Sequence, residues 1–326
     1  MVRTGAHAFV MYDFETGYAS GATPNKKFGL QDKLTSLSLT NNRQNLAKLN
    51  SNTIDKFAYG QQQGSASMGF TLSNPWIFGA LLGAPVTTGS SAPYTHSYNT
   101  AANLKTPRTV SLEVGLDGAS ADIVRTLKGG IVNNISISAA VGGLVECSAD
   151  ITFGQESQPS TSLGNTHVAP TKPVQEFPYT FAHAELLLDG ATVVQCQDVN
   201  LSIAQNSELL YGLNSHAAVA SFRRILDITG SFRASWINSA LLLKLLQQVK
   251  ADSGNSNAYV ETAHTALKLT FIENATNQQI EITCTGLSIG DQSISGLEPA
   301  EPIFEEINWQ VKTIAVVAKS TTAAEE

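Results

Sequence analysis

One spacing in the sequence could support nucleophilic catalysis. Gly286-Leu287-Ser288-Ile289-Gly290 fits the pattern G-x-S-x-G, which exposes a serine on a sharp turn between a strand and a helix. That use of the pattern needs a helix after the serine and a catalytic histidine later in the chain. No helical periodicity follows Gly290, and the last histidine, His264, precedes the serine. We therefore interpret the segment as a turn between strands. Ser288 is then the only residue of the sequence that favours a hydrolase.

Residues that could bind a metal or a cofactor are scattered. The six histidines never lie within five residues of one another, and neither C-x-x-C nor H-E-x-x-H occurs. The segment 117–122 has too few carboxylates for a calcium loop, so a hairpin connection is favoured. Gly129-Gly130 lacks the following helix of a phosphate-binding loop and is predicted to be a turn. We expect no metal, no cofactor and no enzymatic activity.

The cysteines and the apolar runs also limit the function classes. Each cysteine lies in an apolar, strand-like run, and their odd number and wide spacing favour buried free thiols over a disulfide. No apolar run approaches the ~18 residues of a membrane span, and the first residues lack the apolar segment of a secretion signal. The sequence therefore predicts neither a membrane-spanning segment nor a secretion signal. The cysteines are Cys147, Cys196 and Cys284.

The chain is poor in charge, and its charge is uneven. Charged residues make up 14% of the sequence, and the net charge of −7 argues against a general nucleic-acid-binding surface. Residues 1–160 carry a net charge of +1 and residues 161–326 one of −8. Four acids of the second half lie close together: Glu298, Glu301, Glu305 and Glu306. They predict either an exposed loop or a contact or lining that repels other acidic polymers.

Hydrophobic residues alternate with polar ones over most of the chain, which predicts antiparallel strands with one buried face. The clearest runs span 66–72, 110–116, 145–153, 267–271 and 280–284. One short helix is expected in each half. Asn74 and Pro75 open the first, which covers 76–82 and ends at Gly83. The second covers 240–249.

The two halves of the sequence resemble each other. Leu37-Ser38-Leu39 recurs as Leu201-Ser202-Ile203, and Leu49-Asn50-Ser51 recurs at the same offset of 164 residues. Upstream, Ala6-His7-Ala8 matches Ala182-His183-Ala184 at an offset of 176, which places about a dozen extra residues in the first copy, between Thr16 and Lys27. A constant offset with the same order of elements indicates a duplicated domain.

A proline-rich segment lies between the two copies. Residues 154–178 hold four of the 11 prolines and show almost no periodicity, which is typical of a linker. We therefore predict a first domain over 1–155, a linker over 156–177, a second domain over 178–320 and a tail over 321–326. The predicted fold class is mainly β (α+β), with two tandem β-sandwich or barrel domains that each carry one short helix.

The order of strands and turns resembles that of the tail tube (major tail) proteins of tailed bacteriophages, in a duplicated-domain form. The resemblance rests on strand and turn patterns and includes no catalytic signature. The segments that carry it are 94–99, 107–115, 129–138 and 142–151 in the first half, and 181–190 and 201–206 in the second.

This resemblance implies a structural virion protein. Such proteins stack as rings of six domains around a conduit for viral DNA, so two domains per chain imply a homotrimeric, pseudo-hexameric ring. The strands 33–40, 65–72, 197–204 and 222–232 are the candidates for the lumen, and the acids Glu298, Glu301, Glu305 and Glu306 for an acidic contact or lining. The candidate ring-stacking loop comprises Thr16, Gly17, Tyr18, Asn25, Lys26 and Lys27.

The same resemblance implies partners and a location. The partners are further copies of the chain, a tape-measure protein, tail terminator and distal tail or baseplate proteins, in some tails a sheath protein, and viral DNA that passes without specific binding. The protein would belong to the virion tail and be assembled in the host cytoplasm. An acidic, weakly binding lumen would let DNA pass because attractive contacts would slow its transit.

Two other classes of function stay open at the level of sequence. A carbohydrate- or receptor-binding β-sandwich of a virion or cell surface would need an exposed aromatic platform. Trp76, Trp236 and Trp309 lie in apolar runs instead, which predicts that they are buried. A hydrolase would rest on Ser288. Electron microscopy of the purified protein would separate these classes, because only a tube protein forms rings or tubes.

Overall fold

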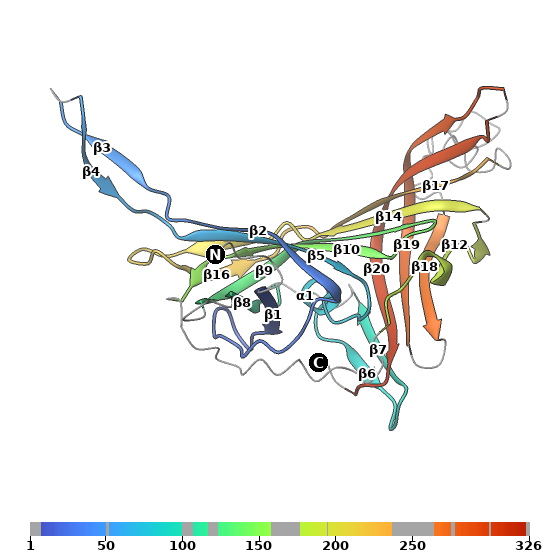
Figure 1. The fold of residues 1–326 in the computed structure, drawn as a ribbon, viewed down its shortest axis with the longest axis horizontal. Helices are drawn as coiled ribbons and strands as arrows, with labels where there is room; N and C mark the ends of the chain where they lie inside the picture. Colours follow the sequence, from blue (N-terminus) through green and yellow to red (C-terminus); the bar gives the residue numbers. More distant parts are fainter. Residues whose placement is uncertain are drawn as a thin grey trace, which may run out of the picture.

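A computed structural model describes residues 8–49, 52–99, 107–116, 123–157, 177–193, 195–236, 264–274, 278–299 and 301–323. The described chain is mainly β, as predicted, and most of its strands belong to one 16-stranded sheet (Figure 1). Apolar side chains from both halves form one hydrophobic core under that sheet. Among the described residues no helix has the length and hydropathy of a membrane span.

The first half forms a sheet of antiparallel neighbours. Strand β5 pairs with β2 on one side and with β10 on the other, β10 pairs with β9, and β9 pairs with β8, which pairs with β1. The elements are β1 (Ala8–Phe14), β2 (Leu30–Thr40), β3 (Gln44–Ala47), β4 (Ile54–Ala58), β5 (Gln63–Thr71), α1 (Phe78–Leu82), β6 (Val86–Thr88), β7 (Tyr94–Asn99), β8 (Val110–Leu116), β9 (Ile123–Ala140), β10 (Glu146–Phe153) and β11 (Gln155–Glu156).

The second half repeats these pairings in the same order. Strand β17 pairs with β14 and β20, β20 pairs with β19, and β19 pairs with β18, which pairs with β12. The hairpin β15–β16 corresponds in position to β3–β4. The elements are η2 (Phe181–His183), β12 (Ala184–Leu188), β13 (Ala191–Thr192), β14 (Cys196–Ala204), β15 (Glu208–Tyr211), β16 (Ala218–Phe222), β17 (Asp227–Ser235), β18 (His264–Asn274), β19 (Gln278–Ser295) and β20 (Phe304–Ser320).

The halves are joined edge to edge by backbone hydrogen bonds. Strand β14 pairs with β9 from Asp198↔Ala140 to Ala204↔Asn134, and β20 pairs with β7. The sheet therefore runs without a break from β2, in the first half, to β13, in the second. Nothing in this arrangement tests the predicted domain boundaries, which stay a prediction. At the expected end of the first domain, Glu156 still belongs to β11 and pairs with Leu127.

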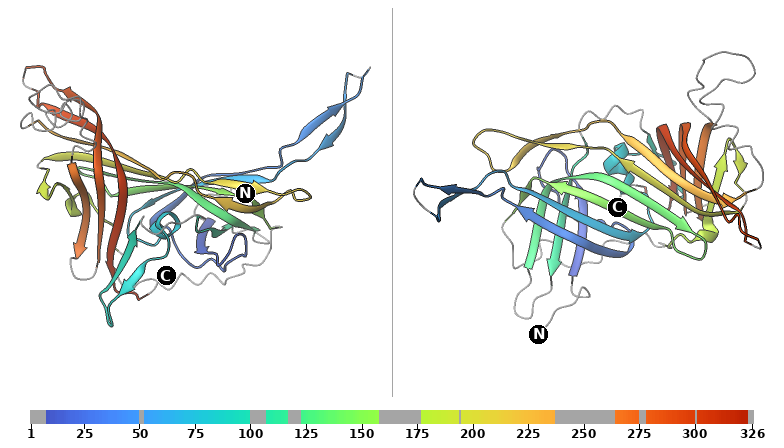
Figure 2. Two further views of the ribbon diagram at one scale, coloured as in Figure 1. Left: turned by 180° about the vertical axis from the view of Figure 1, so that it is seen from behind. Right: turned by 90° about the horizontal axis from the view of Figure 1, so that it is seen from above.

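The strand β9 takes part in two layers. Its first part pairs with β8 and β11, and its second part pairs with β10 and β14. Figure 2 shows β1 and β8 crossing the direction of β2, β5 and β10. Gly129 lies in β9 with a φ of 64°, close to the register shift against β8, and Gly286 lies in β19 with a φ of 73°.

Three interpretations of the sequence were wrong: the turns expected at Gly129 and around Ser288, and the strand expected over 222–232. Gly129-Gly130 and the segment around Ser288 are parts of continuous strands and not turns. At the left-handed Gly129 and at Gly290 the strand takes up an extra residue as a bulge, which shifts the register without ending the strand. The strand expected over 222–232 is interrupted: β16 ends at Phe222 and β17 begins at Asp227. The pair Arg223-Arg224 therefore lies in the connection and not in a strand.

The first predicted helix exists but is shorter than expected. Helix α1 begins after Ile77, because Pro75 and Trp76 form turns that lead into it, and the Asn74 Oδ1 accepts a hydrogen bond from the Trp76 N–H (3.3 Å). It ends at Gly83 as predicted, with a φ of 92°. The second helix, over 240–249, lies outside the described residues, as do most of the predicted linker and the segment 117–122.

A buried histidine fixes the end of β20 to the β6–β7 hairpin. The His96 side chain is fully buried, with Nδ1 2.9 Å from Thr87 Oγ1 and Nε2 2.9 Å from Ser320 Oγ and 3.0 Å from the Thr322 carbonyl oxygen. A neutral imidazole satisfies these partners by accepting at Nδ1 and donating at Nε2. Burial lowers the pKa of His96 below the usual range of a histidine, although the hydrogen bond to the Thr322 carbonyl partly offsets this.

We expect the free energy of unfolding to fall as the pH decreases below about 6.5, because the unfolded chain then binds a proton that folded His96 resists. The variant His96→Gln should be less stable at pH 7 and show a flatter dependence on pH. Urea unfolding of unassembled protein between pH 5 and 7.5 measures this. Ser320→Ala keeps the imidazole and should keep the slope; an unchanged slope in His96→Gln would contradict the assignment.

Candidate functional site

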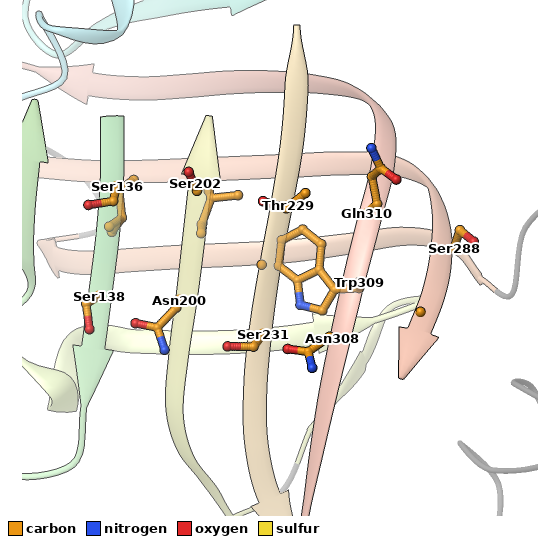
Figure 3. Close-up of a pocket in the computed structure, with 14 residues that line it drawn as sticks. Ser136, Ser138, Asn200, Ser202, Thr229, Ser231, Ser288, Asn308, Trp309 and Gln310 are labelled. Atoms are coloured by element: carbon orange, nitrogen blue, oxygen red, sulfur yellow. The ribbon is translucent and has the colours of Figure 1, made fainter. Parts of the chain in front are cut away.

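The sheet has a polar face opposite the core. Its central residues come from β9, β14, β17, β19 and β20, which lie side by side and line a shallow hollow (Figure 3). The polar side chains that line this hollow are uncharged, and Trp309 lines it as well. They include Ser136, Ser138, Asn200, Ser202, Thr229, Ser231, Ser288, Asn308 and Gln310.

Strict alternation along each strand produces this polar face. On β14, Val199, Leu201 and Ile203 are buried in the core, so Asn200 and Ser202 point to the other side of the sheet. The registers then place Ser138 and Ser231 beside Asn200, and Ser136 and Thr229 beside Ser202. The face continues over β10, β5 and β2 through residues such as Ser148, Ser67 and Ser38.

Hydrogen bonds between neighbouring strands hold these side chains. Ser136 Oγ lies 2.6 Å from Ser148 Oγ, and Ser38 Oγ lies 2.8 Å from Ser65 Oγ. Ser202 donates to Asn134 Oδ1 (3.0 Å). Because these polar groups bond to one another, they offer few free donors to a passing molecule.

Charges lie around the uncharged centre and are mostly negative. By register and alternation, six acids and three bases of the described residues fall on the polar face, an excess of three negative charges. Two acids are engaged locally: Asp150 accepts from Ser67 (2.7 Å) and Asp227 from Gln310 (2.7 Å). The acids are Glu146, Asp150, Asp198, Asp227, Asp291 and Glu306, and the bases are Lys33, Arg233 and Lys312.

The four acids singled out from the sequence do not gather on one face. Glu306 is exposed on the polar face beside Arg233, whereas Glu305 is 5% exposed on the opposite side and accepts from Gln292 (2.8 Å). Glu298 and Glu301 are exposed in a turn, where the Glu301 N–H donates to the Glu298 carbonyl (3.2 Å). The acids of β10, β14 and β17 were missed because they are separated in sequence, although their alternation with core residues could have revealed them.

The insertion between Thr16 and Lys27 packs on its own chain to a large extent. Lys26 is 7% exposed and forms an ion pair with Asp13 (2.7 Å), and its backbone pairs with that of Tyr12. Tyr18 lies against Gly129 and Gly154, where any larger side chain would meet its ring. Thr16 and Gly17 form a turn that is exposed to solvent, and Asn25 and Lys27 are adjacent to Lys26 in the chain. Its role in ring stacking stays a prediction.

Two hairpins project from the sheet instead. The hairpin β3–β4 extends far from the body of the chain, and β15–β16 projects at the same end (Figures 1 and 2). A leucine lies fully exposed near each tip, Leu49 at 99% and Leu213 at 102% exposure. These leucines are equivalent in the repeat, and further exposed apolar residues follow on both hairpins: Leu46, Ile54, Phe57, Tyr59, Leu210 and Val219.

The described residues contain no arrangement for catalysis or metal binding. They hold no group of three or more His, Cys, Asp or Glu side chains that could bind a metal. Ser288 lies within β19 opposite Gln310, so the strand–turn–helix setting of a nucleophile is missing there. All three cysteines are free, as expected; Cys196 is only half-buried, which corrects the prediction that each is buried. Burial raises the pKa of Cys196 to about 11.

The aromatic platform that a carbohydrate-binding module would need is not formed by the tryptophans. Trp76 and Trp309 are buried, at 2% and 3% exposure. Trp236 is half-buried, so its predicted burial is only partial. The geometry therefore defines a class of protein: a β-sheet protein with a polar face and projecting hairpins.

A comparison with family models identifies that class more closely. The model for phage tail tube proteins matches residues 5–311. A comparison with curated proteins gives no match. The chain belongs to the phage tail tube protein family, and it is a structural component of the virion tail.

Glu305 and Glu306 are adjacent acids that should respond differently to neutralisation. Burial raises the pKa of Glu305 above the usual range of a glutamate, so its charge opposes folding at neutral pH, although the hydrogen bond from Gln292 reduces the effect. Glu305→Gln should therefore raise the melting temperature at pH 7, and the gain should disappear as the pH falls below about 4.5. Glu306→Gln, on the exposed face, is the matched control and should change the melting temperature little. Equal effects would contradict this assignment.

Proposed function

We propose that the protein polymerises as stacked rings into the tail tube and that the polar face of its sheet lines the conduit for viral DNA. The observation that supports this most directly is the face itself: a continuous band of hydroxyl and amide side chains with an excess of acids. Membership of the tail tube family supports the same location. The strands predicted to line the lumen, 33–40, 65–72 and 197–204, all contribute to this face, and so does β17.

The proposed mechanism is physical. Phosphate groups bind mainly to lysine and arginine, and each such contact that is broken during transit adds resistance to movement. The acids of the face repel phosphate, whereas its serine, threonine and asparagine side chains form weak contacts at most. DNA would therefore pass without specific binding.

We propose that the chain is a duplicated tube domain and that three chains form one ring of six domains. The repeated pairings support the duplication, because the offsets of 164 residues for β2, β5 and the hairpins and 176 residues for β1 relate paired strands in both halves. The two left-handed glycines, Gly129 and Gly286, also correspond. A ring of six domains with two domains in each chain contains three chains.

Rings would stack through the projecting hairpins, with the insertion at Thr16–Lys27 as a further candidate. An exposed leucine at a hairpin tip is costly in water and stabilising once it is buried in a neighbour. The partners at the tube ends would be the tape-measure, tail terminator and distal tail or baseplate proteins, with a sheath protein in some tails. Assembly would take place in the host cytoplasm.

Electron microscopy of the purified protein tests the proposal directly. We expect rings with three-fold symmetry or tubes with a central channel. A monodisperse monomer over a range of concentrations and salt, also in the presence of tail extract, would contradict it.

Reversing charge on the polar face should slow DNA delivery. We expect virions with Asp150→Lys and Glu306→Lys to form tubes of normal length but to release their DNA more slowly, with a stronger effect at low salt, because lysines bind phosphate. The control Glu185→Lys with Asp189→Lys makes the same charge change on exposed positions of β12 and its turn. Release kinetics from purified virions measure the difference. Equal rates in both variants would count against the lining.

The hairpin tips should be needed for stacking. Leu49→Asp with Leu213→Asp should leave rings intact but reduce tube elongation at least tenfold, because two carboxylates would have to be buried at each contact. Lys27→Glu, in the insertion, tests the alternative stacking loop. Light scattering during polymerisation and electron microscopy of the products give the readout. If the leucine variant forms normal tubes, the hairpin tips are not the stacking contact.

A further inference from the structure

Two strand edges of the described chain lack a neighbouring strand. Strand β2 ends the sheet, since it pairs only with β5 among the described strands. Strand β19 pairs with β18 only as far as Leu287, and further along β19 the residues Asp291–Ser295 pair with β20 on one side and with no described strand on the other. Free edges of this length are templates for pairing with another chain.

The pairing of β14 with β9, called here the internal joint, shows which kind of strand can pair with such an edge. Strand β14 occupies the edge of β9, and the repeat makes β2 the equivalent of β14. The second part of β19 is likewise the equivalent of the second part of β9. Both strands carry a bulge at the same place against their partners, between Val132 and Asn134 in β9 and between Ile289 and Asp291 in β19.

We propose that β2 of one chain pairs with β19 of a second copy, in the register of the joint within the chain. Transferring Leu201↔Ile137 and Ser202↔Ser136 through the repeat gives Leu37↔Ile294 and Ser38↔Ser293. The pairing is antiparallel and continues the polar face from one chain to the next. This inference rests on the proposed ring, and it names the strands and the register that close it.

The side chains at both edges fit this joint. In the internal joint Leu201 and Ile137 are each 2% exposed, because each covers the other on the core side. Their equivalents are not covered within one chain: Leu37 is half-buried and Ile294 is 40% exposed. On the polar face, Ser38 and Ser293 are both exposed. Their equivalents at the internal joint, Ser202 and Ser136, are also serines and lie opposite each other.

The hairpin β3–β4 gives independent support. Its equivalent, β15–β16, is held on the first half of the chain: Tyr211 donates to the Gln62 carbonyl (2.9 Å), and Gln155 donates to the Ala218 carbonyl (3.1 Å). The hairpin β3–β4 instead extends away from the chain (Figure 1). If β2 pairs with β19 of the next copy, the hairpin β3–β4 lies over the second half of that copy. There it can make contacts equivalent to those that β15–β16 makes with the first half of its own chain.

Cross-linking tests the register. In a Cys196→Ser background, Ser38→Cys with Ser293→Cys should be joined between chains by a short bismaleimide, giving covalent dimers and closed trimers on denaturing gels. Ser38→Cys with Ser288→Cys is the matched control: it lies five residues out of register, about 17 Å along the strand, and should yield at least tenfold less product. Ser202→Cys with Ser136→Cys, at the internal joint, should be joined within one chain.

The outcomes separate this inference from the proposed function. Rings or tubes in which only the in-register pair is cross-linked support it. Rings or tubes in which the in-register pair does not react, or reacts no better than the control pair, would overturn the register and leave the ring proposal standing. Protein that forms neither rings nor tubes would overturn the proposed function, and this inference with it.

Discussion

The pairing of β14 with β9 is the interaction on which the rest of the structure depends. It joins the two halves through backbone hydrogen bonds, which any sequence can form, and through the contact of Leu201 with Ile137 on the core side. Because this pairing extends the sheet across the halves, the polar faces of both become one surface. Without it the chain would present two short sheets, and neither would carry the continuous band of hydroxyl and amide groups.

The polar face shows how a chain with few charged residues stays compatible with water. A sheet buries one face in its core, and its other face must stay compatible with water. Here that face uses serine, threonine, asparagine and glutamine, which bond to each other across strands, as Ser136 and Ser148 do. Charges are kept around this centre, and Arg233 lies over the ring of Phe304 at 4.3 Å. The resulting surface is hydrated but makes few strong contacts.

Sequence patterns predicted much of the fold and less of the candidate site. The alternation along residues 145–153 and 280–284 identified β10 and β19, because a period of two requires one buried face. The same period says nothing about which strand lies beside which, so the joint between β14 and β9 was not foreseen. Gly129 and Gly286 were read as turns because a left-handed glycine is common to turns and bulges. The acids Asp150 and Asp227 were missed because they lie far apart in the sequence. Alternation places each of them on the polar side of its own strand, but only the register shows that the two strands share one sheet face.

The long strand β9 has a mechanical consequence. It bonds to β8 in one layer and to β14 in the other. In the second half β19 and β20 run together in the same way, from the part that pairs with β18 to the part that pairs with β17. A load applied to one layer therefore passes along a covalent backbone into the other, and the layers cannot slide independently. Each unit should respond to bending as a stiff body. The bending of an assembled filament would then take place at the contacts between stacked rings and not within one chain.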